Sequence, residues 1–124
     1  MRKLVFGGVV VIVLLVAAVV VWQVLDRDEE TTRGTCGGLS YEVSTEDEQS
    51  EIELTFELQS AGPGETWSVV IEQDGQEVLS GDRVTDEDGE LDAEVLVPES
   101  NGTSFTVTAT PEGGGDACEV SVEA

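Results

Sequence analysis

The side chains best able to do chemistry in this sequence are two cysteines and 27 carboxylates, and no histidine accompanies them. Without histidine, a Ser-His-Asp triad, a Cys-His pair, a histidine-ligated zinc site and a blue-copper site are all excluded. No glycine-rich phosphate loop occurs, because Gly7-Gly8 lies in an apolar run and residues 113–115 are predicted to form a turn. Carboxylate pairs suit glycosidase chemistry, but a domain this small offers no evident cleft for a sugar. The residue types therefore predict a protein that is not an enzyme and carries no cofactor.

The two cysteines, Cys36 and Cys118, are predicted to form a structural disulfide. A lone pair at the two ends of a small extracytoplasmic domain is typical of such a bond. Closing a loop of roughly 80 residues stabilises a fold by about 4 kcal/mol in the chain-entropy model. Two free thiols or a catalytic pair are the alternatives, but the spacing does not fit a CxxC motif and no histidine can activate a thiol. We expect the bond to pin the domain where the chain leaves for the membrane.

An acidic turn offers a second possible site. Asp86, Asp88 and Glu90 supply the carboxylate oxygens that Ca²⁺ prefers, although the segment is much shorter than an EF-hand loop. A plain acidic hairpin turn explains the same residues.

A third motif concerns covalent modification. Asn101-Gly102-Thr103 matches the N-glycosylation sequon. Asn-Gly is also a preferred hairpin turn, so both interpretations of Asn101 remain open.

Charge restricts the partners of the chain. All 27 acidic residues follow residue 25, where only Arg27, Arg33 and Arg83 oppose them, so the segment 26–124 carries a net charge of −24. Such a surface repels phosphate backbones and anionic lipid headgroups, which excludes nucleic acid and predicts a domain that stands away from the membrane. The composition is typical of a protein from a salty habitat or from a high-GC actinobacterium. Self-repulsion of this size predicts stability that depends on salt.

Residues 4–25 form an uncharged, apolar run of 22 residues, which predicts one transmembrane helix. A helix of that length spans about 33 Å, and a hydrocarbon core is about 30 Å thick. Arg2 and Lys3 precede the run and acidic residues follow it. This bias predicts a cytoplasmic stub over residues 1–3 and a single-pass cell-membrane protein whose C-terminal domain is extracytoplasmic. We interpret the run as an uncleaved signal anchor.

Two other interpretations of the N-terminal segment remain open. A cleaved signal peptide needs a shorter apolar core that ends at a small-x-small site, for which Val16-Ala17-Ala18 is a poor match. A pilin-like or archaellin-like subunit would place the apolar helix in a filament core. The carboxylate expected early in a bacterial pilin helix is missing, since residues 9–13 are all Val or Ile.

The remaining sequence divides into a linker and a β domain. Residues 26–35 lack apolar periodicity, so we expect a flexible acidic stalk. From residue 36 onward apolar and polar residues alternate, which predicts strands with one buried face. The expected strands cover residues 39–43, 52–58, 67–71, 76–79, 91–97, 105–109 and 118–122. Turn signals separate them, with Asp74-Gly75 typical of a type I′ hairpin. The pattern predicts an all-β, antiparallel sandwich of about seven strands over residues 36–124.

On these features residues 36–124 resemble the immunoglobulin-like and fibronectin-type-III-like modules of bacterial and archaeal surface proteins. The strand count, the strand at residues 67–71 before a DG hairpin, and the segments FTVTAT and CEVSVEA carry the resemblance. It implies an Ig-like architecture and a broad role in adhesion, spacing or recognition. The cysteines depart from the antibody pattern, because they would tie the first strand to the last and not two central strands. The tyrosine-corner residue is also missing.

Together these observations predict a membrane-anchored, extracytoplasmic, Ig-like module that binds, adheres or spaces at the cell surface. Its contact with the membrane is the segment 4–25, and the sequence does not specify the protein or cell-envelope partner. An accessory subunit of a membrane complex is an alternative, since Ala17-Ala18 permits helix packing. The filament subunit described above is the other alternative.

Overall fold

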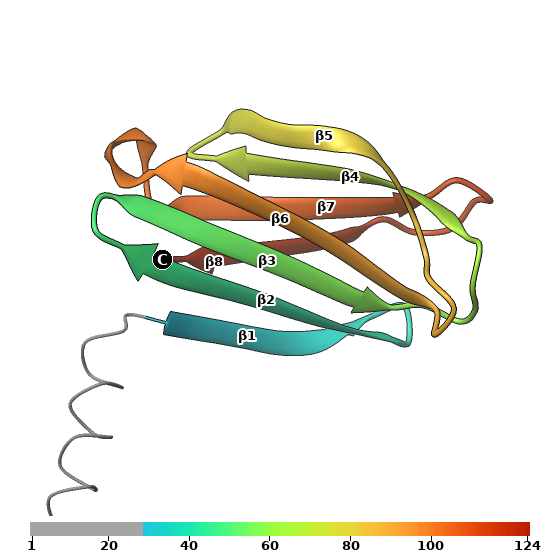
Figure 1. Ribbon diagram of the computed structural model, residues 1–124. Helices are drawn as coiled ribbons and strands as arrows, with labels where there is room; N and C mark the ends of the chain where they lie inside the picture. The colour runs from blue at the N-terminus through green and yellow to red at the C-terminus, as the bar shows by residue number, and fades with distance from the viewer. Residues whose placement is uncertain (1–28) are drawn as a thin grey trace, which may run out of the picture.

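The computed structural model describes residues 29–124, which form two antiparallel sheets packed face to face (Figure 1). This arrangement confirms the all-β sandwich. The strands are β1 (Glu29–Cys36), β2 (Leu39–Glu48), β3 (Glu51–Gln59), β4 (Thr66–Gln73), β5 (Gln76–Val84), β6 (Glu90–Pro98), β7 (Ser104–Pro111) and β8 (Cys118–Glu123), with a 3-10 helix η1 (Glu99–Asn101) between β6 and β7. The predicted stub, membrane span and residues 26–28 of the stalk lie outside the described residues. Among residues 29–124, no helix has the length and apolar character to span a membrane.

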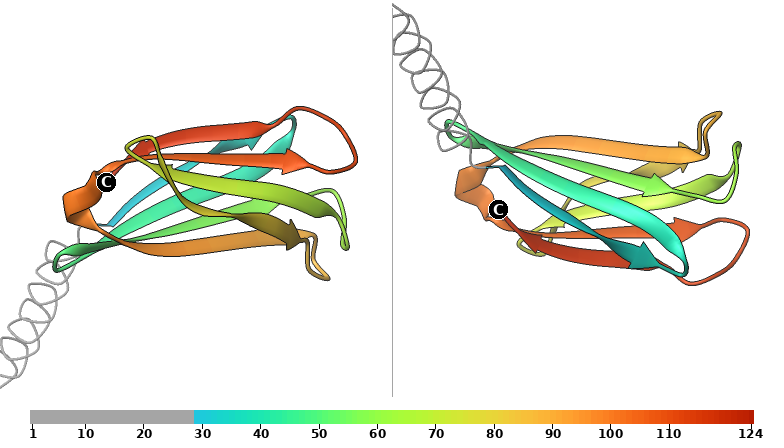
Figure 2. Two further views of the ribbon diagram at one scale, coloured as in Figure 1. Left: turned by 90° about the horizontal axis from the view of Figure 1, so that it is seen from above. Right: turned by 90° about the horizontal axis from the view of Figure 1, so that it is seen from below.

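The strand order is β1-β2-β3-β6 in the first sheet and β5-β4-β7-β8 in the second. Figure 2 shows the sheets as two layers viewed along their edges. Hairpins join β1 to β2, β2 to β3, β4 to β5 and β7 to β8, and the other three connections cross between the sheets. The β4–β5 hairpin has positive φ at Asp74 (48°) and Gly75 (82°), as a type I′ turn requires. The hairpin predicted at this position is therefore confirmed.

The core lies between the two sheets and consists of the inward member of each alternating pair. Its fully buried members include Leu54, Phe56, Val69, Ile71 and Phe105. All seven strands expected from the alternation are present, because each has one apolar face to bury. Gln73 is the exception among the inward residues of β4, since a polar side chain is only 2% exposed there.

The segment predicted to be a flexible stalk forms the eighth strand, so that prediction is wrong for residues 29–35. β1 pairs with β2 from Glu29 opposite Glu46 to Cys36 opposite Leu39. Most of its side chains are exposed, because it lies at the edge of the sheet. Hydrophobic periodicity detects a buried face, and an edge strand with little burial gives almost no such signal. The sandwich therefore begins at Glu29 and not at Cys36.

The strands run between two ends of the molecule, which we call the entry end and the far end. The entry end, on the left in Figure 1, is where Glu29 begins β1, and it also carries η1 and the C-terminus. The far end carries the connections at residues 37–38, 60–65, 85–89 and 112–117. The eight residues of β1 separate the two ends by about 23 Å.

Candidate functional site: the acidic face of the first sheet

The predicted disulfide is confirmed: Cys36 and Cys118 are bonded, with 5.5 Å between their Cα atoms and a sequence separation of 82. Cys36 ends β1 and Cys118 begins β8, so the bond joins edge strands of different sheets. The bond lies at the far end, because β1 carries the chain along the whole sandwich before it reaches Cys36. The expectation that the disulfide pins the point of departure toward the membrane is therefore wrong.

The acidic turn proposed for Ca²⁺ is organised by its own backbone. The Oδ1 atom of Asp86 accepts hydrogen bonds from the backbone N–H groups of Asp88 and Glu90, both at 2.9 Å. The backbone N–H of Asp86 also donates to the carbonyl of Glu90 at 2.9 Å. Within residues 29–124, Asp86 and Asp88 do not join Glu90 in a cluster of carboxylates close enough to share an ion.

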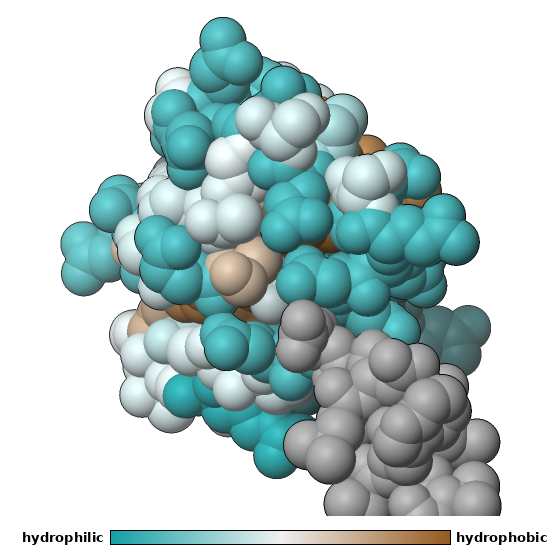
Figure 3. Space-filling view, turned by 90° about the vertical axis from the view of Figure 1, so that its left-hand side faces the viewer, coloured by the Kyte–Doolittle hydropathy of each residue, from teal (hydrophilic) through white to brown (hydrophobic). Residues whose placement is uncertain are grey.

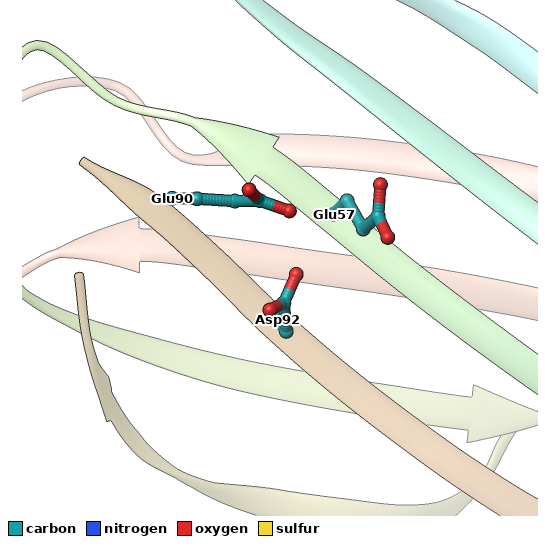
Figure 4. Close-up of side chains that lie close together, drawn as sticks. All are labelled: Glu57, Glu90 and Asp92. Atoms are coloured by element: carbon teal, nitrogen blue, oxygen red, sulfur yellow. The ribbon is translucent and has the colours of Figure 1, made fainter. Parts of the chain in front are cut away.

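The structure places Glu90 beside two other carboxylates, those of Glu57 and Asp92. One oxygen from each of the three lies within 4.8 Å of the others. Glu57 projects from β3, and Glu90 and Asp92 project from β6 on the same solvent-facing side (Figure 4). The sequence alone did not reveal this cluster, because β3 and β6 pair in the sheet although β4 and β5 of the other sheet separate them along the chain. Three such oxygens are suitable ligands for a hard cation, and they repel one another when all are ionised.

The neighbouring carboxylates change the pKa of one member of this cluster. A side-chain hydrogen bond to Asp92, together with the negative charges of Asp92 and Glu57, raises the pKa of Glu90 above its ordinary value. The same effect recurs farther along the sheet. A side-chain hydrogen bond to Glu94 and the charge of that carboxylate raise the pKa of Glu53. At both positions the folded state therefore favours retention of a proton.

These pairs belong to one continuous surface, which we call the acidic face. It is the outer side of the first sheet, where the cross-strand register collects ten carboxylates: Glu29, Glu42, Glu46, Glu48, Glu51, Glu53, Glu57, Glu90, Asp92 and Glu94. Arg33 contributes the ion pair of this face, at 3.3 Å from Glu42, and its side chain is 75% exposed. Like charges directly opposite one another in a sheet destabilise it, as at Glu46 and Glu53.

A shallow hollow of about 400 Å³ lies on the acidic face toward the far end. The side chains of Arg33, Glu42, Glu57 and Glu90 line it, together with Gln59. Gln59 donates a hydrogen bond of 2.7 Å to the carbonyl of Asp88, which connects this hollow to the acidic turn. The hollow is open to solvent, and carboxylates dominate its charge.

The outer side of the second sheet differs, because hydroxyl groups predominate on it. Eight Ser or Thr residues face outward there: Thr66, Ser68, Ser80, Ser104, Thr106, Thr108, Thr110 and Ser121. Thr106 and Ser121, which are opposite each other in β7 and β8, lie with their hydroxyl oxygens 3.4 Å apart. Negative charge is thus concentrated on one sheet of the sandwich.

The sequon residue Asn101 ends η1 at the entry end and is exposed to solvent. Figure 3 views this end directly and shows a mostly hydrophilic surface with small hydrophobic areas. The connection there crosses from β6 in the first sheet to β7 in the second, so Asn101-Gly102 is not the two-residue turn of a hairpin.

The sequence matches no protein-family model and no curated protein, and the structure matches no solved structure. The chain is thus characterised by its architecture: an antiparallel sandwich of two four-stranded sheets, joined by a disulfide and acidic on one face.

Proposed function

We propose that this protein is a membrane-anchored, extracytoplasmic, non-catalytic module of Ig-like or fibronectin-type-III-like architecture, which binds or spaces at the cell surface. The segment 4–25 is its anchor, and the sandwich is its working part. The arrangement of connections carries the proposal: the chain enters the sandwich at one end and presents four connections at the other. A module held by its entry end presents its far end to the surroundings.

The pairing of strands supports the Ig-like part of the proposal. β3 pairs with β6, β4 with β7, and β7 with β8, as strands B with E, C with F, and F with G pair in Ig-like domains. Trp67 on β4 is buried, at the strand where Ig domains carry their core tryptophan. Two features are this chain's own: the additional edge strand β1, and a disulfide between the first and last strands.

The far end is preorganised for contact with a partner. The backbone N–H of Ser60 donates to the carbonyl of Gly89 at 2.8 Å, and the hydroxyl of Thr85 donates to the carbonyl of Gly62 at 2.8 Å. These bonds lock the β3–β4 connection to the β5–β6 connection. Loops that are already ordered lose less conformational freedom on binding. The β7–β8 loop, residues 112–117, is exposed and projects at the same end (Figure 2).

The position of the carboxylates supports a non-catalytic role. Glycosidases hold two carboxyl groups on either side of a bound sugar, which requires a cleft. Glu57, Glu90 and Asp92 instead project side by side from a solvent-facing sheet (Figure 4). Their arrangement suits attraction of cations to an open surface.

The experiment that tests the proposal exploits the position of Lys3, the only lysine in the chain. Intact cells are treated with a membrane-impermeant amine-reactive reagent and, separately, with an antibody raised against the folded sandwich. We expect the antibody to bind intact cells, and Lys3 and the N-terminal amine to be labelled only after permeabilisation. Labelling of Lys3 on intact cells, with antibody binding only after permeabilisation, would show the opposite orientation and overturn the proposal. A cytoplasmic protein with many lysines serves as the control for membrane integrity.

A further inference from the structure

The chain contains one asparagine, Asn101, and the structure shows that the local turn does not require it. Asn is favoured in tight turns mainly because it tolerates positive φ. In residues 29–124 the only residues other than glycine with positive φ are Gln49 and Asp74. Asn101 therefore has an ordinary backbone conformation at the end of η1. The hairpin explanation for its presence does not hold.

The glycine after it, in contrast, is demanded by the fold. Gly102 has φ of 130°, and a Cβ atom at this position would overlap the carboxylate of Asp74. Its backbone N–H donates to the carbonyl of Glu99 at 3.0 Å, which closes the η1 turn. The backbone conformation and the proximity of Asp74 therefore explain the glycine at position 102, and neither of them requires asparagine at position 101.

The side chain of Asn101 is also available to solvent. Asn101 is exposed, and among residues 29–124 its carboxamide forms no hydrogen bond. Beneath it the loop is held firmly, because Gln73 donates to the carbonyls of Pro98 and Gly102, each at 2.8 Å. The backbone N–H of Ser104 donates to Asp74 Oδ1 at 3.1 Å. The loop thus presents an unoccupied amide on a fixed corner of the sandwich.

We propose that Asn101 is a site of N-linked glycosylation. The inference rests on the proposed function, because it requires the sandwich to be extracytoplasmic. The acceptor segment is Asn101-Gly102-Thr103, and Gly102 satisfies the exclusion of proline from its central position. The donor is a lipid-phosphate-linked or lipid-pyrophosphate-linked oligosaccharide. The Nδ2 atom of Asn101 bonds to the anomeric carbon of the sugar, the bond from that carbon to phosphate breaks, the lipid phosphate leaves, and Nδ2 releases one proton to a base.

The position of Asn101 gives such a glycan a physical role. It lies at the entry end, the same end at which Glu29 begins β1. A bulky hydrated chain at this end would add volume where the chain enters the sandwich. The hydroxyl-rich and acidic faces, and the far end, would remain uncovered.

The test is the mass of one peptide from the full-length protein, purified from the membranes of its natural host. After reduction, trypsin releases residues 84–124 as one fragment, since Arg83 is the last basic residue of the chain. We expect this fragment to exceed its amino-acid mass by a whole number of sugar residues. The variants Asn101→Gln and Thr103→Ala should lose the excess completely, and Thr103→Ser should retain it. A fragment of unmodified mass, or an excess that persists in Asn101→Gln, overturns the inference.

A separate measurement distinguishes this failure from failure of the proposed function. Binding of the antibody to intact cells reports the location of the sandwich independently of any sugar. An unmodified fragment from a protein that the antibody reaches on intact cells refutes the glycosylation alone. An unmodified fragment from a protein that the antibody cannot reach refutes both.

Discussion

Individual carboxylates determine the surface chemistry of the first sheet. Most of its outward side chains on the first sheet are acidic, and two of them, Glu53 and Glu90, have raised pKa values because a neighbouring carboxylate shares their surroundings. Both are only half-buried, so water screens each pair, and each pair weakens the fold only modestly. Their combined repulsion is larger, because the acidic face carries ten carboxylates and a single arginine.

A first prediction concerns pH. For an acid whose pKa is higher in the folded state, the folded protein binds more protons than the unfolded chain in the interval between the two pKa values. The free energy of unfolding should therefore rise as pH falls from neutral toward the ordinary carboxyl pKa of about 4.3, because Glu53 and Glu90 become protonated. Urea denaturation at pH 7 and pH 5, at low ionic strength, measures the change. A lower free energy of unfolding at pH 5 would contradict this explanation.

A second prediction isolates one pair on the acidic face. Glu94→Gln removes the carboxylate whose hydrogen bond and charge raise the pKa of Glu53, so it should raise the melting temperature at pH 7 and reduce the gain on acidification. Glu119→Gln is the matched control, since it removes the same charge from an exposed position opposite Thr108 on the second sheet. Equal effects of the two variants at pH 7 would show that net charge, and not the acidic face, determines the response.

A third prediction concerns Gln73, whose buried amide holds the β6–β7 crossing. Gln73→Leu should lower the free energy of unfolding by about 2 kcal/mol, because the carbonyls of Pro98 and Gly102 would lose their donor. Gln76→Leu, at an exposed position, should change it by about 0.5 kcal/mol or less. If the two variants had equal stability, the role assigned to the Gln73 amide would be refuted.

At the scale of elements, the sequence predicted the strands that bury a face and failed where burial is absent. The apolar alternation from Ile52 to Leu58 predicts β3, because every second side chain of this strand is buried in the core. β1 has almost no buried side chains, and what makes it a strand is backbone pairing with β2. Gly34 lies close under the ring of Tyr41, where a Cβ atom would be 2.5 Å from the Tyr41 Oη. Backbone pairing depends on which strand lies alongside, and the local sequence pattern of β1 does not show that.

The candidate site shows the same division. The acidic turn was visible in the sequence, whereas the cluster of Glu57 with Glu90 and Asp92 depends on the adjacency of β3 and β6. The alternation of Glu51, Glu53 and Glu57 signalled an acidic strand face. The acidic residues of β6 were also visible in the sequence, but the two strands of the other sheet that lie between β3 and β6 in the chain hid their proximity. The disulfide pair was predictable, and its location at the far end was not.

A fourth prediction follows from β1 as an edge strand. In an antiparallel pair only alternate residues of an edge strand direct their N–H groups toward the neighbour. Amide exchange over residues 29–36 should therefore alternate between slow and fast along the strand. Uniformly fast exchange would support a flexible stalk in place of β1. Slow exchange at every residue would indicate a further partner on the free edge.

In the whole molecule, the disulfide stabilises the sandwich and the repulsion between its negative charges destabilises it. The disulfide joins the two sheets at the far end and closes 82 positions of sequence, for about 4 kcal/mol in the chain-entropy model. Against it stands a net charge of −24 over residues 26–124. Ions screen that repulsion over about 10 Å at 0.1 M salt and about 3 Å at 1 M. Stability should therefore depend on both the redox state and the salt concentration.

A fifth prediction combines these two variables. Reduction should lower the melting temperature by roughly 15 °C or more at low salt, because a domain of this size loses several degrees for each kcal/mol. Raising NaCl from 0.05 to 1 M (about these concentrations) should recover part of the loss, through screening within the Debye length. Melting curves with and without reductant across this range give the answer. A melting temperature that changes with neither reductant nor NaCl would contradict these roles of the disulfide and of charge repulsion.

We propose a disulfide-closed sandwich located outside the cytoplasm, and the redox state of its two cysteines in intact cells tests the bond and the location together. Intact cells are quenched in acid, and free thiols are trapped with an alkylating reagent before and after reduction. We predict no trapped thiol before reduction and two after it, at Cys36 and Cys118, because a bond between them persists only in an oxidising compartment. Two thiols trapped before reduction would contradict both the native disulfide and the oxidising compartment.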